Sequence, residues 1–378
     1  MQQIKNKVYI NLIMSTIAMT LLSSILTGCG LGSSTDKTDE AYSLISNLDY
    51  QNAITTFEEG LENGEDERKI YRGEGIAYIG EGKYNEAISC LTKALSLSSG
   101  IVEPMDYDIN YYLALAYYKN GDIDEAIGIY NTILSLKPGE VDAVYLRGVL
   151  YAEKNMLDEA LASFNQVISI EPDNYDRIIR IYVILADNGY KETGQGYLKS
   201  AMDNGTKKMS NYEKGQISFY LEDYESAKTY LEKAREEEGY EAVLLLGKTY
   251  EMLGDNNYAV SVFSSYANSD EPSPEILNEM GLCKMSMNDY EGALAAFEEA
   301  ISIPNNSMLQ TLKFNEIVCY EHLGQFERAR GLMDIYINNY PDDENAKDEY
   351  TVLKTRENFS GPVLYRWSNF TKIQYRFW

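Results

Sequence analysis

The sequence predicts an all-α solenoid, in which pairs of antiparallel helices stack one on the next. Three observations predict this class: a 34-residue period, small and aromatic residues at fixed places within it, and a proline near its end. The period is clearest where residues 107–140 are compared with residues 141–174. Self-similarity at such a period is typical of stacked repeats and not of a chain folded around one core.

Each recurring place has a physical reason. In residues 107–140 the eighth and twentieth places hold Ala114 and Ala126, and the twenty-fourth holds Tyr130. A small residue lets two helices cross closely, and an aromatic ring beside it fills the remaining space. Glycine or asparagine near the fifteenth place ends the first helix, and proline at the thirty-second place, as in Pro138, stops the second.

The period divides the chain into segments. A first repeat is expected near 34–67 and a second at 68–101, and a short insert at 102–106 precedes the third. In the fifth repeat Gly194 stands where alanine is usual, so we interpret it as degenerate. The predicted organisation is repeats 1–4 over 40–174, the degenerate repeat over 175–207, repeats 6–9 over 208–343 and a capping helix over 344–357.

This arrangement of small, aromatic and proline positions resembles the tetratricopeptide repeat family. The resemblance covers roughly residues 34–357. It implies an α-solenoid of about nine helix hairpins, wound into a right-handed superhelix.

The first 28 residues predict an export signal. Lys5 and Lys7 precede an apolar run from Val8 to Leu26, and the run ends in Leu26-Thr27-Gly28-Cys29. A basic start, an apolar middle and small residues before a cleavage point describe such a signal, and this ending resembles a bacterial lipobox. We expect a lipoprotein signal peptide over 1–28, lipid on Cys29 and a polar tether over 29–39; two acyl chains give stable attachment. The alternative is a plain transmembrane anchor.

The chain is strongly acidic. It has 33 Lys and Arg against 59 Asp and Glu, a net charge of −26. The predicted signal peptide holds two lysines and no acid, so its removal would leave −28. This charge repels nucleic acid and anionic lipid, so we expect neither as a partner of the helical body.

Catalytic and metal-binding constellations are hard to assemble from this sequence. The single histidine, His322, would have to serve any Ser-His or Cys-His pair, and we interpret it as a bystander. Cys90, Cys283 and Cys319 fall within repeats and are interpreted as small buried apolar residues. We therefore predict no enzyme activity, no cofactor and no metal, although a pair of carboxylates is not excluded by counting.

The family resemblance implies a concave groove lined by the first helix of each hairpin. Side chains at places 2, 5, 9, 12 and 13 would face it, including Leu244, Lys248, Asn278, Leu282 and His322. The apolar, tyrosine-bearing character of these places suits a peptide, but many tyrosines could instead pack between helices. Lysine and asparagine of a carboxylate clamp are largely replaced, so a clamp is not expected. The predicted partner-binding residues are Tyr42, Arg72, Ile76, Tyr111, Tyr118, Tyr145, Val149, Ile179, Tyr212, Phe219 and Phe314.

An aromatic basic tail over 358–378 breaks the repeat pattern. Residues 359–378 hold both tryptophans, three cations and no acid. The tail could contact a membrane interface or fold back on the acidic body, and it could also be a non-native extension.

We therefore expect a scaffold or adaptor, attached to the extracytoplasmic side of a bacterial cell membrane through Cys29, that binds a protein or peptide in its groove. The first alternative is a regulator or adaptor of cell-wall enzymes or envelope assembly. A weaker alternative is a carbohydrate-binding surface lipoprotein, suggested only by tyrosines that could stack on sugar rings.

Overall fold

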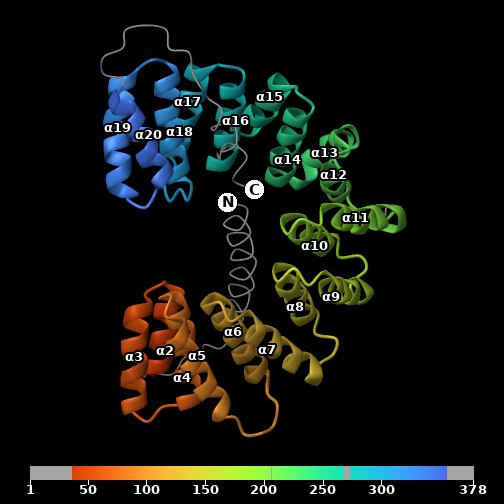
Figure 1. Ribbon diagram of the computed structural model, residues 1–378, viewed down its shortest axis with the longest axis vertical. Coiled ribbons are helices and arrows are strands. Elements are labelled where there is room, and N and C mark those ends of the chain that lie inside the picture. The colour runs from red at the N-terminus through yellow and green to blue at the C-terminus, as the bar shows by residue number, and fades with distance from the viewer. Residues whose placement is uncertain (1–35, 206, 268–272, 356–378) are drawn as a thin grey trace. The chain divides into compact units, whose positions relative to one another are not determined.

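The computed structural model describes residues 36–205, 207–267 and 273–355, and the secondary structure of these residues is helical (Figure 1). This confirms the predicted all-α class. Within the same residues no helix is both long and apolar enough to cross a bilayer. The predicted signal peptide, Cys29 and the tail lie outside the described residues.

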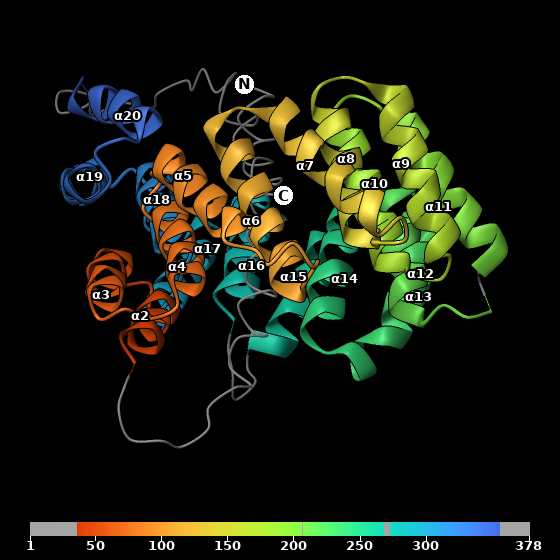
Figure 2. The ribbon, with the colours of Figure 1, turned by 90° about the horizontal axis from the view of Figure 1, so that it is seen from below.

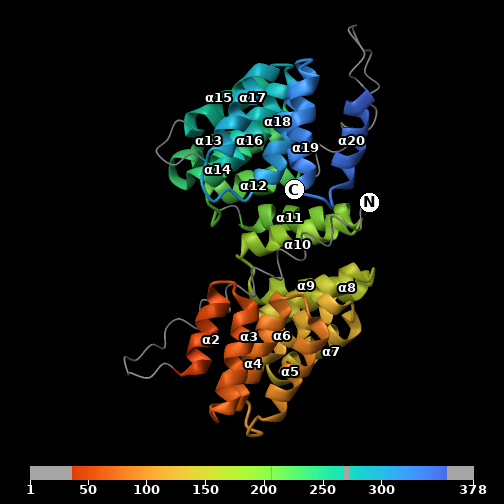
Figure 3. The same cartoon turned by 90° about the vertical axis from the view of Figure 1, so that its left-hand side faces the viewer.

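Within the described residues, consecutive helices form nine hairpins, followed by one further helix. Figures 1 and 2 show α8 and α9 side by side, and Figure 3 shows α18 beside α19. The hairpins are α2 (Lys37–Ser46) with α3 (Tyr50–Glu62), α4 (Glu67–Gly80) with α5 (Tyr84–Ser96), α6 (Pro104–Asn120) with α7 (Ile123–Leu136), α8 (Val141–Glu153) with α9 (Leu157–Ile170), α10 (Tyr175–Asp187) with α11 (Lys191–Gly205), α12 (Asn211–Tyr220) with α13 (Tyr224–Glu238), α14 (Tyr240–Met252) with α15 (Asn256–Ala267), α16 (Pro274–Ser286) with α17 (Tyr290–Ile301), and α18 (Leu309–His322) with α19 (Phe326–Asn339), before α20 (Glu344–Thr355).

Two segments outside the predicted repeats are partly helical. α2 begins at Lys37, so the last residues of the predicted tether are helical. The expected insert at 102–106 is partly helical too, because Pro104 occupies the first turn of α6 and Glu103 and Asp106 form a capping box. Arg68 of α4 holds this start of α6 by donating to both carboxylates.

The helices of a hairpin meet where a small residue faces a large one sixteen positions later. A Cβ atom added at Gly247 would lie 2.2 Å from the Phe263 ring, and one added at Gly281 would lie 2.4 Å from the Phe297 ring. Both rings are fully buried. The pairs Gly75–Leu91, Gly148–Phe164 and Gly215–Leu231 show the same close approach.

In the fifth hairpin the large residue lies on the first helix and the small residue lies on the second. Its eighth place holds Tyr182 in place of a small residue, and its twentieth holds Gly194 in place of alanine. A Cβ atom at Gly194 would lie 3.0 Å from the Tyr182 ring. The glycine that makes this repeat look degenerate in sequence therefore makes room for the tyrosine that departs from the pattern.

In each described hairpin, a residue with positive φ, in the left-handed region of backbone dihedral angles, follows the first helix. The residue is glycine in five hairpins, asparagine in two, Leu48 in the first (φ 62°) and Glu222 in the sixth (φ 64°). The next residue donates its backbone N–H to the carbonyl five positions earlier, at 2.7–2.9 Å in all nine described hairpins. This bond is the signature of a Schellman motif, and it satisfies a carbonyl that the end of the helix leaves unpaired.

The described helices divide into two compact units after Tyr197, a residue within α11. In the first unit, the largest core cluster joins α6–α10 and includes Tyr130, Tyr145 and Phe164. In the second unit, the largest cluster joins α13–α18 and includes Phe263 and Phe297. Each unit therefore has its own apolar core.

Replacing Leu48 by glycine should stabilise the first unit. A left-handed conformation costs a non-glycine residue roughly 1–2 kcal/mol, and the Leu48 side chain is 65% exposed, so little apolar burial is lost. Part of the gain is offset by the greater freedom of glycine in the unfolded chain. We expect the free energy of unfolding to rise by about 0.5–1 kcal/mol, measured by urea denaturation followed by circular dichroism.

The matched control is Gly121→Ala at the equivalent place of the third hairpin. Gly121 has φ 94°, and a Cβ atom there meets nothing within 4 Å. This substitution should therefore destabilise through backbone strain alone. If both substitutions change stability in the same direction, the strain argument is wrong.

Candidate functional site

The candidate site is the row of first helices within each unit. In the first unit α2 contacts α4, α4 contacts α6, and α8 contacts α10; in the second unit α12 contacts α14. Hereafter the first-helix face means the side chains of α2, α4, α6, α8 and α10, or of α12, α14, α16 and α18, at the groove-facing places predicted from the sequence. The two units are described separately.

The predicted partner-binding residues of the first unit differ in exposure. Tyr42 and Tyr111 are half-buried, and the Tyr111 hydroxyl is itself buried. The other six are buried: Arg72, Ile76, Tyr118, Tyr145, Val149 and Ile179. These six residues pack between helices, and they present little side-chain surface to a partner.

Arg72 links the first three hairpins on this face. Its Nε donates to the Asp108 carboxylate of α6, and its Nη1 donates to the Tyr42 hydroxyl of α2 at 2.9 Å. The Tyr42 hydroxyl in turn donates to the carbonyl of Lys69 at 2.8 Å. The Arg72 guanidinium also lies 5.5 Å from the centroid of the Tyr42 ring, within cation–π range.

Arg177 makes an equivalent link between the fourth and fifth hairpins. Its Nη1 lies 2.8 Å from the Asp142 carboxylate and its Nε lies 3.0 Å from Glu171. Its guanidinium lies 5.4 Å from the centroid of the Tyr145 ring, which is 2% exposed. Neither acidic partner, Asp108 or Asp142, was predicted from the sequence, although both occupy the second place of their repeats.

The predicted residues of the second unit are all half-buried: Tyr212, Phe219 and Phe314. Gln216 donates to the Tyr212 hydroxyl at 3.1 Å. The Phe219 ring meets Tyr224 edge to face at a centroid distance of 5.6 Å, and Phe314 lies 5.7 Å from the Tyr336 ring. All three residues pack against the core of the second unit and remain partly exposed.

A polar cluster joins α14 to α16 on the same face. Lys248 Nζ lies 3.3 Å from Glu279 Oε1, and the Cys283 thiol donates to Glu251 Oε1 at 2.8 Å. Burial raises the pKa of Glu251 to about 7, against the donated thiol bond, which lowers it. Burial also lowers the pKa of Lys248 and raises that of the Cys283 thiol, so the thiol stays protonated. Cys283 is thus a hydrogen-bond donor as well as a small buried residue.

Comparison with known sequences decides the family. Three sequence models, all described as tetratricopeptide repeat, match residues 72–141 and 113–175, residues 210–236 and 274–307, and residues 314–343. The chain belongs to the tetratricopeptide repeat family. Repeats of this kind bind protein or peptide partners along their stacked helices, so the fold indicates a protein-binding scaffold or adaptor, a type of protein that is typically not an enzyme.

Individual relatives of this tetratricopeptide repeat protein are distant. A TPR repeat-containing protein of Methanocaldococcus jannaschii, MJ1428, is 27% identical over 255 residues, which are 61% of this chain and 37% of that relative. This chain therefore aligns with little more than a third of the relative's length.

Two solved structures are similar in fold. Yeast Tom70 has a TM-score of 0.47 at 15% identity, covering 85% of this chain and 88% of that chain. A tetratricopeptide repeat protein from Parabacteroides merdae has a TM-score of 0.45 at 16% identity, covering 67% of this chain and 98% of that chain.

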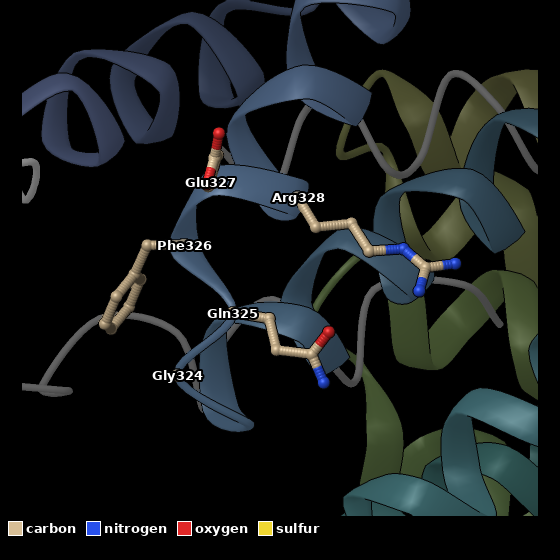
Figure 4. Close-up of a pocket in the computed structure, with 5 residues that line it drawn as sticks. All are labelled: Gly324, Gln325, Phe326, Glu327 and Arg328. Carbon is tan, nitrogen blue, oxygen red and sulfur yellow. The ribbon is translucent and has the colours of Figure 1, made fainter.

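The remaining candidate features of the repeats have structural partners. The His322 ring stacks on Tyr290 with a centroid distance of 4.2 Å and an interplanar angle of 10°. A shallow hollow lies at the turn before α19, lined by residues 324–328, where Phe326 and Arg328 point in different directions (Figure 4). Arg328 lies over the Tyr320 ring at 4.2 Å. Among the described residues no group of His, Cys, Asp and Glu side chains could hold a metal ion.

The raised pKa of Glu251 predicts a pH-dependent stability of the second unit. Its pKa is about 7 when folded and 4.5 ordinarily, so the folded state holds the proton more tightly. The associated stability is fully present below pH 4.5 and is lost as the pH rises to 7. We expect a loss of about 3 kcal/mol across this window, measured from urea denaturation of the second unit.

Glu251→Gln provides the comparison, because it keeps the shape of the side chain and cannot ionise. The variant should lose this part of the pH dependence and be more stable than the native chain at pH 7.5. An unchanged profile between pH 4.5 and pH 7 would show that Glu251 does not titrate in this window.

Proposed function

We propose that this tetratricopeptide repeat protein is a membrane-anchored scaffold on the extracytoplasmic side of a bacterial cell membrane. It binds a protein or peptide along the first-helix face. The observation that carries this proposal is the set of half-buried aromatic residues on that face: Tyr42, Tyr111, Tyr212, Phe219 and Phe314.

These aromatic residues suit recognition of a partner because packing and hydrogen bonds fix their rings in place. An aromatic residue buries a large area at low entropic cost, and truncating such a residue at an interface often removes much of the affinity. The packed partners of Phe219 and Phe314 fix both rings before any ligand arrives. The face around Arg72 is likewise fixed by its bonds to Asp108 and Tyr42. Such preorganisation reduces the cost of ordering side chains on binding.

The anchor part of the proposal is supported by the sequence. Lys5 and Lys7 precede the apolar run from Val8 to Leu26, and Cys29 follows two small residues. Lipid on Cys29 would hold the acidic helical body beside the membrane, while its net negative charge disfavours contact with anionic lipid. A scaffold in this position would have access to extracytoplasmic proteins.

Removing two accessible rings should weaken partner binding. In Tyr111→Ala with Tyr212→Ala, we expect at least a tenfold loss in recovery of cross-linked partner, because truncating an interfacial anchor costs about 2 kcal/mol. Recovery is measured by quantitative mass spectrometry after affinity purification from envelope extract. Circular dichroism establishes that the helices are retained.

The control is Tyr258→Ala, which removes a ring that is 59% exposed on the second helix α15. This variant should recover partner as the native chain does. Equal recovery by the two kinds of variant would remove the first-helix face from the proposal. Recovery of a cell-wall enzyme as the main partner would assign the scaffold to its regulation, and binding of glycans without protein would favour the carbohydrate alternative.

Cys29→Ala should abolish lipid attachment and release the chain from the membrane fraction. We expect the native chain to show the mass of a processed, acylated protein, because the thiol of Cys29 is the acceptor. Intact mass spectrometry and membrane fractionation measure this directly. Identical masses and identical membrane recovery for the two chains would contradict the anchor.

A further inference from the structure

The segment 359–378 has a composition opposite to that of the rest of the chain. It contains Arg366, Lys372 and Arg376, no acidic residue and seven aromatic residues, within a protein of net charge −26. The segment lies outside the described residues, which end with Thr355 of α20. Both of the chain's tryptophans, Trp367 and Trp378, belong to it.

The first-helix face of the second unit offers apolar surface to such a segment. Tyr212, Phe219, Leu244, Leu282 and Phe314 pack against the core of that unit and remain only partly buried. They come from all four first helices, α12, α14, α16 and α18. This row of accessible apolar side chains therefore extends along the whole stack of the second unit.

The same face is acidic. Its groove-facing places include two carboxylates, Glu241 of α14 and Glu275 of α16. Lys248, the cation among them, already pairs with Glu279. The face therefore carries an excess of negative charge beside its apolar row, which is complementary to the cations and rings of the segment.

We propose that residues 359–378 bind the first-helix face of the second unit of the same molecule. The aromatic residues of the segment pack on the row from Tyr212 to Phe314, and its cations lie near Glu241 and Glu275. Twenty extended residues span up to about 70 Å. Four first helices at successive packing distances of 8–10 Å cover roughly 30 Å, so the segment can follow the row from α18 to α12.

Covalent connection favours this contact over a contact between molecules. Only residues 356–358 separate the segment from α20, and a short connection gives an effective concentration in the millimolar range. Weak apolar and ionic contacts are therefore sufficient to populate the bound form. The segment would compete with any partner that uses the same face and so would regulate the scaffold proposed above.

The two tryptophans report directly on this contact. The tryptophan emission of the full chain is compared with that of a synthetic peptide of residues 359–378 in the same buffer. We expect emission at shorter wavelength and weaker quenching by acrylamide in the full chain, because the rings are shielded from water. The shift should be independent of protein concentration and smaller in high salt, which screens the ionic part.

Variants on both sides locate the contact. Arg366→Glu, Lys372→Glu and Arg376→Glu together, or Glu241→Lys with Glu275→Lys, should move the emission toward that of the free peptide. Tyr212→Ala with Phe314→Ala should do the same, and Tyr258→Ala on α15 should leave it unchanged. Because Glu241 is exposed and Glu275 half-buried, the lysine variants test the contact without removing core packing.

Three outcomes would overturn the inference. Emission of the full chain equal to that of the peptide shows a solvated segment. A shift that appears only with rising protein concentration shows binding to a second copy. A shift that appears only on adding vesicles of anionic phospholipid shows a membrane contact. Tyr111 belongs to the first unit, so partner recovery by the single variant Tyr111→Ala does not involve this contact, and the proposed function and this inference can fail separately.

Discussion

The close crossing of the two helices in each hairpin is the constraint on which the rest of the structure depends. A residue without a side chain, or with a methyl group alone, lets the second helix place a large side chain directly over the first. Gly148 with Phe164 and Ala114 with Tyr130 occupy the same places in neighbouring hairpins, and all four are buried. The relation recurs about every 34 residues, except in the fifth and ninth hairpins, whose eighth places hold Tyr182 and Ile317, so most hairpins present the first helix in the same way. A row of equivalent side chains on successive first helices is the consequence.

Polar contacts on that row join one hairpin to the next. Arg72 with Asp108 and Arg177 with Asp142 connect first helices of the first unit, and Lys248 with Glu279 connects first helices of the second. A half-buried ion pair contributes modest stability because desolvation offsets the attraction between the charges. Its geometry nevertheless fixes the rings that lie against it, such as Tyr42 and Tyr145. The accessible aromatic residues of the face are thus set in a framework of ion pairs that join successive first helices.

The fold could be predicted from the sequence because its determinants are local and repeated. The places of Ala126, Tyr130 and Pro138 within one period are enough to define a hairpin. The exposure of face residues could not be predicted in the same way, since it depends on side chains that reach across from the next hairpin. Tyr145 occupies a groove-facing place, yet the Arg177 guanidinium lies over its ring and the residue is 2% exposed. In the fifth hairpin, likewise, the role of Gly194 depends on Tyr182 of the other helix, whose volume it accommodates.

Stability measurements on two glycines of the second unit test the central claim most directly. Gly247 faces the Phe263 ring, whereas a Cβ atom at Gly331 of α19 meets nothing within 4 Å. The account predicts that Gly247→Ala lowers the free energy of unfolding by about 1–3 kcal/mol, the usual cost of overpacking. It predicts that Gly331→Ala raises this free energy by about 0.5–1 kcal/mol through helix propensity. Equal stabilisation by both substitutions would contradict the claim that close crossing at the small residue holds the hairpins together.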